Sequence, residues 1–318
     1  MRRVIAGTGK VLITLGVLVL LFVVYLLWGT GIYESRAQGD LQSQFKSDLS
    51  RVHSRTGPST SSTTQPGTTA TTVPGATTTT TTTVPKPAPP VPFGDAVAHL
   101  VIPHANVDKY VVEGVGVPDL RKGPGHYPQT PMPGQAGTAA IAGHRTTYGA
   151  PFWSLSDLVT GDKIYVTTLQ GSFTYTVVKD PFPVDPHDFS VLDNVADPAH
   201  PGRNEARLTL STCNPRFSAS QRLIVEARLD LPPAAAPLPP QVRKGPKAHL
   251  AGADLAGATE SKTPVFLWGA IAALVGALWW LLFHRHARWT TWLVGVIPFL
   301  VTLFVFFTYL ERVLPSNY

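Results

Sequence analysis

Residues 207–229 read RLTLSTCNPRFSASQRLIVEARL and predict two β-strands joined by a short loop. Side chains alternate along the first strand, so the leucines lie on one face and Cys213 lies with polar residues on the other. Asn214-Pro215 then breaks the strand. We therefore expect Cys213 to be accessible, at a strand end that opens into a loop.

Arg222 begins the second strand, Arg222–Leu229, after a loop of eight residues. If the two strands pair, the start of one lies beside the end of the other, and Cys213 and Arg222 share the polar face. Ile224 interrupts the alternation along this strand. A guanidinium at this place favours a thiolate and can bind the oxyanion of a tetrahedral intermediate. An ordinary surface arginine is the alternative reading of Arg222.

The surrounding segment, Gly94–Leu231, has the size of one domain and a pattern of short strands. Gln170-Gly171 is a hairpin signal, and a short helix is predicted near Phe152–Leu158. The other strands are predicted at Ala96–Ile102, Lys109–Glu113, Thr138–Ala142, Lys163–Leu169 and Ser172–Lys179. Short strands with Gly and Pro turns indicate an all-β barrel or sandwich. The sequence carries no Gly-rich phosphate loop and no Cys/His metal spacing, so we expect neither a cofactor nor a metal.

Cys213 is the single cysteine of the chain, so an intramolecular disulfide is ruled out. In an exported protein such a cysteine is an intermolecular bridge or a reactive thiol, and a buried structural thiol is the third reading. The chain has ten histidines. His144 is the preferred proton carrier because Gly143 frees its backbone and the small apolar strand Thr138–Ala142 precedes it.

Three apolar runs, Val11–Trp28, Val265–Phe283 and Trp289–Leu310, predict transmembrane helices. The first has eighteen residues, more than the roughly 7–15 of a cleaved signal, so an uncleaved anchor is preferred. Ser35-Arg36-Ala37 is a weak cleavage signal that keeps the alternative open. The net charge is +6, and much of the basic excess flanks these runs. By the positive-inside rule the N-terminus is then cytoplasmic and residues 29–264 lie outside.

Composition divides the rest of the chain. The tract Thr56–Pro92 lacks the apolar side chains that would offset ordering entropy, so it is expected to be disordered. A specific spacer and a featureless linker are both open for it. No nucleic-acid partner is expected, because basic and aromatic residues are not interleaved. The predicted units are 1–28 (cytoplasmic N-terminus and first transmembrane helix), 29–93 (extracytoplasmic Thr/Pro-rich disordered stalk), 94–231 (globular domain), 232–264 (Pro/Ala-rich linker), 265–283 and 289–310 (transmembrane helices), 284–288 (cytoplasmic turn) and 311–318 (tail).

The strand sequence Thr209-Leu210-Ser211-Thr212-Cys213 resembles the TLxTC signature of sortases, and Arg222 follows it as the arginine of that family does. Ala142-Gly143-His144 resembles the sortase histidine motif. The longer runs Gly125–Pro128 and Gly143–Phe152 are similar to class E sortases of actinobacteria. This resemblance covers roughly residues 96–229. The two C-terminal apolar runs depart from the common layout with a single anchor.

The resemblance implies an eight-stranded sortase-type β-barrel with short helices, and a cysteine transpeptidase without cofactor or metal. Cys213 would be the nucleophile, His144 the proton shuttle and Arg222 the partner of the oxyanion. An LAxTG- or LPxTG-like C-terminal sorting signal of a surface protein would be cut after Thr through a thioacyl-enzyme. A lipid-linked cell-wall precursor amine would then take the protein. The location implied is the plasma membrane of a Gram-positive, actinobacterial cell.

Two further residues are candidates for substrate contact. Tyr110 resembles a tyrosine of class E enzymes on an early strand, and a half-buried strand aromatic is its alternative role. Thr212 either touches the substrate backbone or only packs. Two other functions stay open: a thiol hydrolase that releases peptides into water, and a non-catalytic stalked module that binds the wall.

Overall fold

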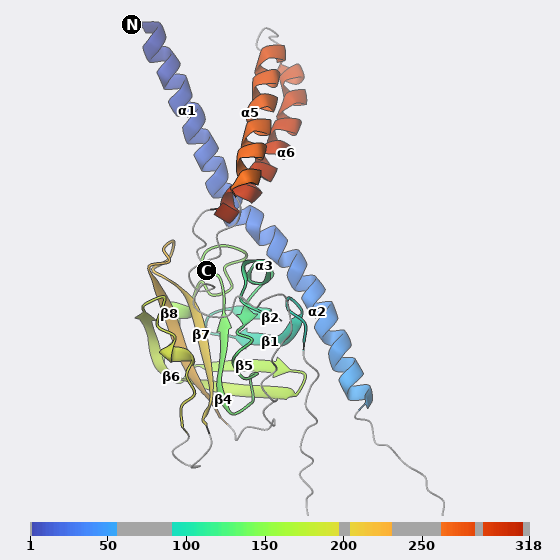
Figure 1. Cartoon of the computed structure of the whole chain (residues 1–318), viewed down its shortest axis with the longest axis vertical. Helices are drawn as coiled ribbons and strands as arrows, with labels where there is room; N and C mark the ends of the chain where they lie inside the picture. Colours follow the sequence, from blue (N-terminus) through green and yellow to red (C-terminus); the bar gives the residue numbers. More distant parts are fainter. Residues whose placement is uncertain (1, 56–90, 197–203, 231–261, 284–288, 314–318) are drawn as a thin grey trace, which may run out of the picture.

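The computed structural model describes residues 2–55, 91–196, 204–230, 262–283 and 289–313. A β-barrel lies at one end of the molecule, and long helices extend away from it (Figure 1). Most of the tract 56–92 and of the linker 232–264, the turn 284–288 and most of the tail 311–318 lie outside the described residues.

Eight strands close into a barrel in the order β1-β2-β3-β4-β7-β8-β6-β5. The eight-stranded all-β fold is therefore confirmed. The strands are β1 (Ala96–Ile102), β2 (Val107–Glu113), β3 (Gly125–His126), β4 (Gly137–Ala142), β5 (Lys163–Thr168), β6 (Gly171–Val184), β7 (Ala206–Asn214) and β8 (Gln221–Leu229), with short helices α3 (Val117–Leu120), η2 (Leu155–Asp157) and η3 (Ser190–Leu192). Seven of these eight strands follow from the residue pattern. The exception is β3, whose two residues are too few to show a period.

The barrel interior is filled by one face of each strand. Leu208 and Leu210 of β7 point into it, as the alternation predicts, and both are fully buried. The opposite face of β7 is buried as well, because Leu120 of α3 and Tyr127 cover it. Each fully buried leucine contributes about 1.5–3 kcal/mol through the hydrophobic effect. Both faces of β7 are thus enclosed, which decides the environment of Cys213.

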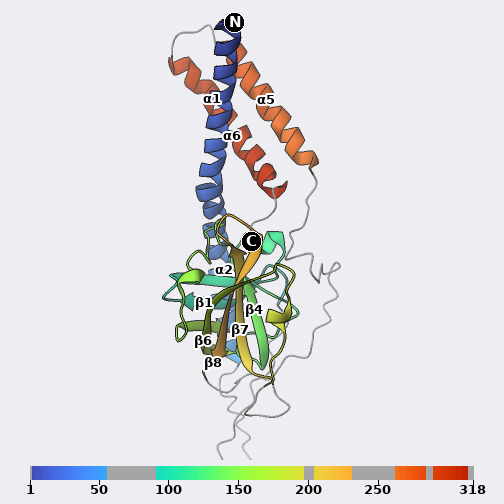
Figure 2. The same cartoon turned by 90° about the vertical axis from the view of Figure 1, so that its left-hand side faces the viewer.

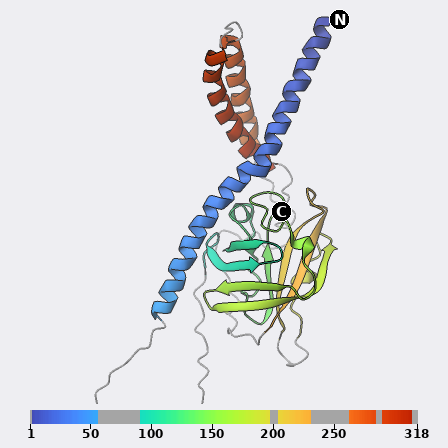
Figure 3. The same cartoon turned by 180° about the vertical axis from the view of Figure 1, so that it is seen from behind.

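The N-terminal residues form one long bent helix rather than an anchor followed by a disordered stalk (Figure 3). α1 (Arg2–Val24) continues through a π-helical turn, η1 (Tyr25–Gly29), into α2 (Thr30–Arg55). The prediction of disorder over 29–93 is therefore wrong for residues 30–55. Leu41 and Phe45 of α2 are buried against β1 and β2. Together with Leu49 they repeat every four residues, which is the period of one helix face.

Gln38 of α2 completes an open edge of β2. The short β3 pairs only with Val112 and Glu113, so the outer backbone groups of Tyr110 meet no strand. The side-chain amide of Gln38 takes the place of a neighbouring strand. Its Oε1 accepts from the Tyr110 N–H at 2.7 Å, and its Nε2 donates to the Tyr110 carbonyl at 2.9 Å. Nε2 also donates to the Lys122 carbonyl at 2.9 Å. The helix thus satisfies a β-edge that the barrel leaves unpaired.

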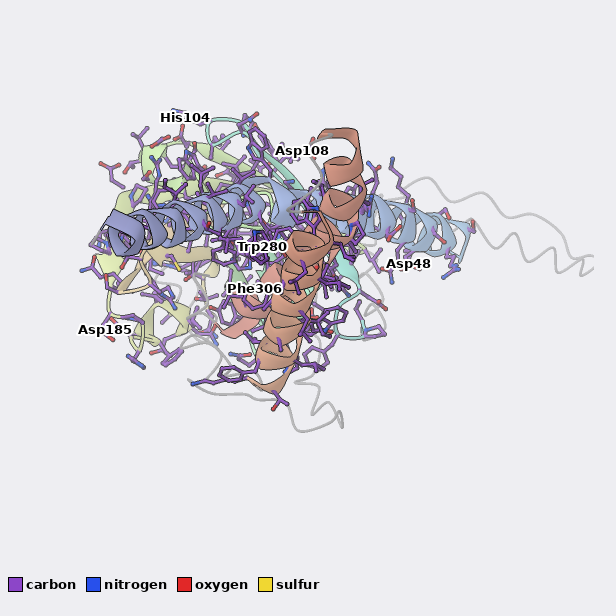
Figure 4. All side chains as sticks on the ribbon, turned by 90° about the horizontal axis from the view of Figure 1, so that it is seen from above. Asp48, His104, Asp108, Asp185, Trp280 and Phe306 are labelled. Atoms are coloured by element: carbon purple, nitrogen blue, oxygen red, sulfur yellow. The ribbon has the colours of Figure 1, made fainter. Side chains whose placement is uncertain are left out.

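The predicted apolar runs are all helical. α5 (Thr263–Phe283) and α6 (Trp289–Val313) form an antiparallel pair beside α1 (Figure 2). Within α5, Thr263–Leu282 is long and apolar enough to cross a membrane. Among the described residues of α1 and α6, the apolar segments Leu12–Val24 and Gly295–Leu310 are shorter. Phe22 and Tyr25 pack against α6, with ring centroids 5.0 Å from Phe307 and 5.2 Å from Phe304. Seen from above, the labelled Trp280 and Phe306 lie on the α5–α6 pair (Figure 4).

We expect Gln38→Leu to loosen α2 from the barrel, because it leaves the backbone groups of Tyr110 without partners. An unsatisfied buried group costs about 1–3 kcal/mol, so the melting temperature falls and amides of residues 30–55 exchange faster. Hydrogen–deuterium exchange with mass spectrometry measures this. Ser43→Ala is the matched control, since its hydroxyl contacts only Gly39 of the same helix. Equal exchange in both variants would contradict the docking role of Gln38.

Candidate active site

The site is built on three neighbouring strands, β4, β7 and β8. β7 and β8 are antiparallel, and their register pairs Cys213 directly with Arg222. Paired residues in such a ladder point to the same face. The structure therefore brings together the two residues that the alternation places on the outer face.

β4 lies on the other side of β7 and runs parallel to it, with Ala142 opposite Ser211. The ladder continues past the end of β4. The Gly143 N–H donates to the Ser211 carbonyl at 3.1 Å, and Thr212 Oγ1 donates to the Gly143 carbonyl at 2.7 Å. Two residues beyond the Ala142–Ser211 pair, the register places His144 level with Cys213, one strand spacing of about 4.8 Å away.

His144 just past the end of β4, Cys213 of β7 and Arg222 of β8 thus form a row in the order of their elements, with Cys213 in the middle. Ala142 shares a buried cluster with Cys213, so position 144, two residues further along, returns to the same outer face. The loop with His144 and the strand with Arg222 thus flank β7 on its two sides.

Cys213 is more enclosed than the sequence suggested. Its side chain is buried, with only 2% of the residue exposed. The expectation of an accessible thiol is wrong because Leu120 and Tyr127 cover the outer face of β7. Burial raises the pKa of Cys213 to about 11, against the opposing effect of Arg222 and Arg145. At neutral pH the resting group is therefore a neutral thiol.

Arg145 is a site residue that sequence reasoning missed. Its Nη1 donates to the Cys213 carbonyl at 2.9 Å and to Asn214 Oδ1 at 2.8 Å. Burial lowers the pKa of Arg145, and the charge of Arg216 lowers it further. Its position directly after His144 in the motif was the available signal. The positive charges of Arg145 and Arg222 both favour the ionised form of the Cys213 sulfur.

Arg222 is anchored to the loop between β7 and β8. Its Nη1 donates to the carbonyls of Ala219 and Gln221, at 3.1 and 3.2 Å. The residue is 4% exposed, so the alternative of a surface arginine does not describe it. A guanidinium held by the backbone keeps its place relative to the thiol.

The loop that follows β4 orients His144. Thr147 Oγ1 lies 3.2 Å from His144 Nδ1, and the ring centroid of Tyr148 lies 5.0 Å from that of the imidazole. The Phe152 N–H donates to the His144 carbonyl at 3.0 Å. Gly143 is required here, because a Cβ would lie 2.6 Å from the Phe152 ring. His144 is therefore buried, and both its side chain and its backbone carbonyl are bonded within the loop.

Neither of the two candidate substrate-contact residues, Thr212 and Tyr110, is exposed beside Cys213. Thr212 is buried and bonded to the Gly143 carbonyl, so it packs and holds the ladder. Tyr110 lies on β2, three strands around the barrel from β7. Its ring stacks on His99 at 4.6 Å, and Gln42 of α2 donates to its hydroxyl at 3.3 Å. Among the described residues, no three His, Cys, Asp or Glu side chains are grouped to hold a metal ion.

Comparison with known proteins identifies the barrel as a domain of a known family. Residues 100–230 match the sortase domain family. Sortase SrtE1 of Streptomyces coelicolor is 30% identical over 231 residues, covering 70% of this chain and 56% of that protein. Sortase D of Bacillus subtilis is 34% identical over 122 residues, covering 38% of this chain and 56% of that protein. The chain thus spans about half the length of these curated relatives.

Among solved structures, sortase E of Streptomyces avermitilis is 40% identical, with a TM-score of 0.39. That match covers 44% of this chain and 91% of the solved chain. The family match and the identity to sortase SrtE1 agree with the motifs around His144 and Cys213, and they support the class E resemblance. The chain belongs to the sortase family, whose members are cysteine transpeptidases.

Proposed function

We propose that this protein is a membrane-anchored sortase that attaches surface proteins to the cell wall. The observation that carries the proposal is the strand pairing around β7: Arg222 of β8 lies opposite Cys213, and β4 on the other side leads to His144. The substrate we propose is an LAxTG- or LPxTG-like sorting signal, cut between Thr and Gly. The acceptor is the amine of a lipid-linked peptidoglycan precursor.

In the first half-reaction Cys213 Sγ attacks the carbonyl carbon of Thr. The thiol proton passes to His144 and from there to the leaving Gly amine, so the peptide bond breaks and a thioester forms. Arg222 would hold the negative oxygen of the tetrahedral intermediate. In the second half-reaction the acceptor amine attacks the thioester, and its proton returns through His144 to the sulfur.

The neutral resting thiol supports proton transfer during attack rather than a preformed thiolate. With a pKa of about 11, only about one Cys213 in ten thousand is ionised at pH 7. A general base beside the sulfur would overcome this, and His144 is the base we propose, because it follows β4, the neighbour of β7. Arg145 and Arg222 stabilise the negative charge once it forms.

For the membrane we propose three spans, with α1, α5 and α6 in the bilayer and the barrel on the outer side. Thr263–Leu282 has the length and composition of a span, and the aromatic contacts of Phe22 and Tyr25 join α1 to α6. The orientation rests on the basic residues at the N-terminus and in the turn 284–288.

Incubation with an LAxTG-type peptide is expected to add the acyl mass to the intact protein, and Cys213→Ala is expected to abolish the adduct. The adduct is a thioester, so hydroxylamine removes it. Intact-protein mass spectrometry reads both results. His144→Ala should slow acylation by about 10²–10⁴-fold. The matched control is His104→Ala, since His104 is half exposed and contacts Asp162 instead. An adduct on Cys213→Ala would end the proposal.

Adding a glycine oligomer is expected to convert the cleaved product from the free acid to an amide. Amine transfer distinguishes a transpeptidase from a thiol hydrolase, because both pass through the same thioester. Liquid chromatography with mass spectrometry separates the two products. Free acid alone, at saturating amine, would favour the hydrolase.

Alkylation of Cys213 by iodoacetamide should rise about tenfold per pH unit from pH 7 to 10, because the thiolate is the reacting form and its pKa is about 11. Arg222→Gln should slow alkylation at each pH, since removing a positive charge raises the pKa of Cys213 further. Arg228→Gln, an exposed change on the same strand, is the matched control. Mass spectrometry follows the single labelled site. A plateau near pH 8.5, as for an unfolded thiol, would contradict the buried setting.

A further inference from the structure

Helix α2 contacts the loop that carries His144. The Tyr148 N–H donates to Thr30 Oγ1 at 3.0 Å, and Thr30 is buried. The Thr30 hydroxyl in turn donates to the Leu26 carbonyl at 2.7 Å in the preceding turn. Thr30 is the first residue of α2. The start of this helix is therefore hydrogen-bonded to the backbone four residues after the histidine.

That loop adopts a conformation that needs support. Tyr148, Gly149 and Ala150 have φ angles of 49, 70 and 44° in succession. A left-handed backbone is unfavourable for residues other than glycine and persists where the surroundings hold it. Within the loop, the Ala150 N–H donates to the Thr147 carbonyl. The bond from Tyr148 to Thr30 provides a hold from outside the loop.

Glu34, one helical turn further along α2, touches the same loop. A Cβ on Gly149 would lie 2.5 Å from Glu34 Oε2, so helix and loop are in direct contact. Lys109 Nζ of β2 donates to Glu34 Oε1 at 2.7 Å, and the side chain of Glu34 is only 2% exposed. This buried ion pair holds α2 against the barrel at the place where Gly149 passes.

Aromatic side chains link α2 to the imidazole of His144. The ring of Tyr148 lies 6.3 Å from Tyr33 of α2 in an edge-on arrangement and 5.0 Å from the ring of His144. The guanidinium of Arg121 lies 5.7 Å from the centre of the same tyrosine ring. Tyr148 therefore stands between the helix and the proton carrier.

We propose that α2 positions His144, with Thr30 and Glu34 as positioning residues that act through the loop 147–150. The inference rests on the proposed function in that His144 carries the proton of the reaction. α2 continues directly from α1, so the helix that leads from the predicted membrane anchor also supports the active-site loop. Removing the support should affect the geometry of the imidazole before it affects peptide binding.

The test uses the full-length protein in detergent, labelled with ¹³C at histidine Cε1, with the His144 signal assigned by its loss in His144→Gln. Thr30→Val keeps the shape and removes the acceptor of the Tyr148 N–H. We expect the His144 signal to move, kcat to fall about tenfold and the acidic limb of the pH–rate profile to shift, with KM for the peptide changed less than about twofold. Thr30→Ser keeps the hydroxyl and should restore all of these.

Gln42→Leu is the matched control, because it removes a contact of α2 with Tyr110 far along the helix from the loop. It should leave the His144 signal and kcat as in the wild type. Glu34→Gln keeps the shape but weakens the pair with Lys109, and should move the signal in the same direction as Thr30→Val. Melting curves of all variants exclude unfolding as the cause.

An unchanged His144 signal in Thr30→Val would overturn the inference, as would an equal change in Gln42→Leu. The signal is read without turnover. A wild-type protein that cleaves no peptide would refute the proposed function and leave this structural test standing.

Discussion

The site depends on the parallel ladder between β4 and β7 and on its extension beyond the end of β4. The backbone N–H of Gly143 and the hydroxyl of Thr212 extend the ladder to Gly143, the residue before His144. A slip of one residue would turn His144 to the opposite face of the sheet, away from Cys213. The β7–β8 pair adds Arg222 by the same principle. Strand register thus pairs Cys213 with Arg222 and leads the chain to His144 on the other side of β7.

Enclosure on both faces of β7 explains the chemistry of the thiol. A buried sulfur surrounded by Leu120, Tyr127 and two alanines is costly to ionise, and two arginines offset only part of that cost. At neutral pH the resting sulfur is thus protonated and a weak nucleophile. Attack requires a base at the sulfur and stabilisation of the new charge, so reactivity follows from the arrangement around Cys213 and not from its ionisation alone.

Local patterns predicted most of the barrel. Alternation identified the inner face of β7, and both the pairing and the shared face of Cys213 and Arg222 follow from it. Burial of the outer face could not be predicted, because Leu120 and Tyr127 are far from β7 in the sequence. The role of Arg145 was hidden for the same reason, since its partners are backbone and loop atoms of residues 213 and 214. The polar composition of residues 30–55 hid the helix face marked by Leu41, Phe45 and Leu49.

The docking of α2 changes what the Thr/Pro-rich tract can do. As a stalk, its length would set the distance between membrane and barrel. In the structure the residues before it belong to α2, and Leu41 and Phe45 of that helix pack on Ala96, in the first strand after it. Both ends of the tract therefore join one body, and whatever path residues 56–90 take, their length does not set that distance. The separation between the barrel and α1 is set by the continuous helix α1–η1–α2, whose contacts with Tyr110 and Tyr148 hold the barrel beside it.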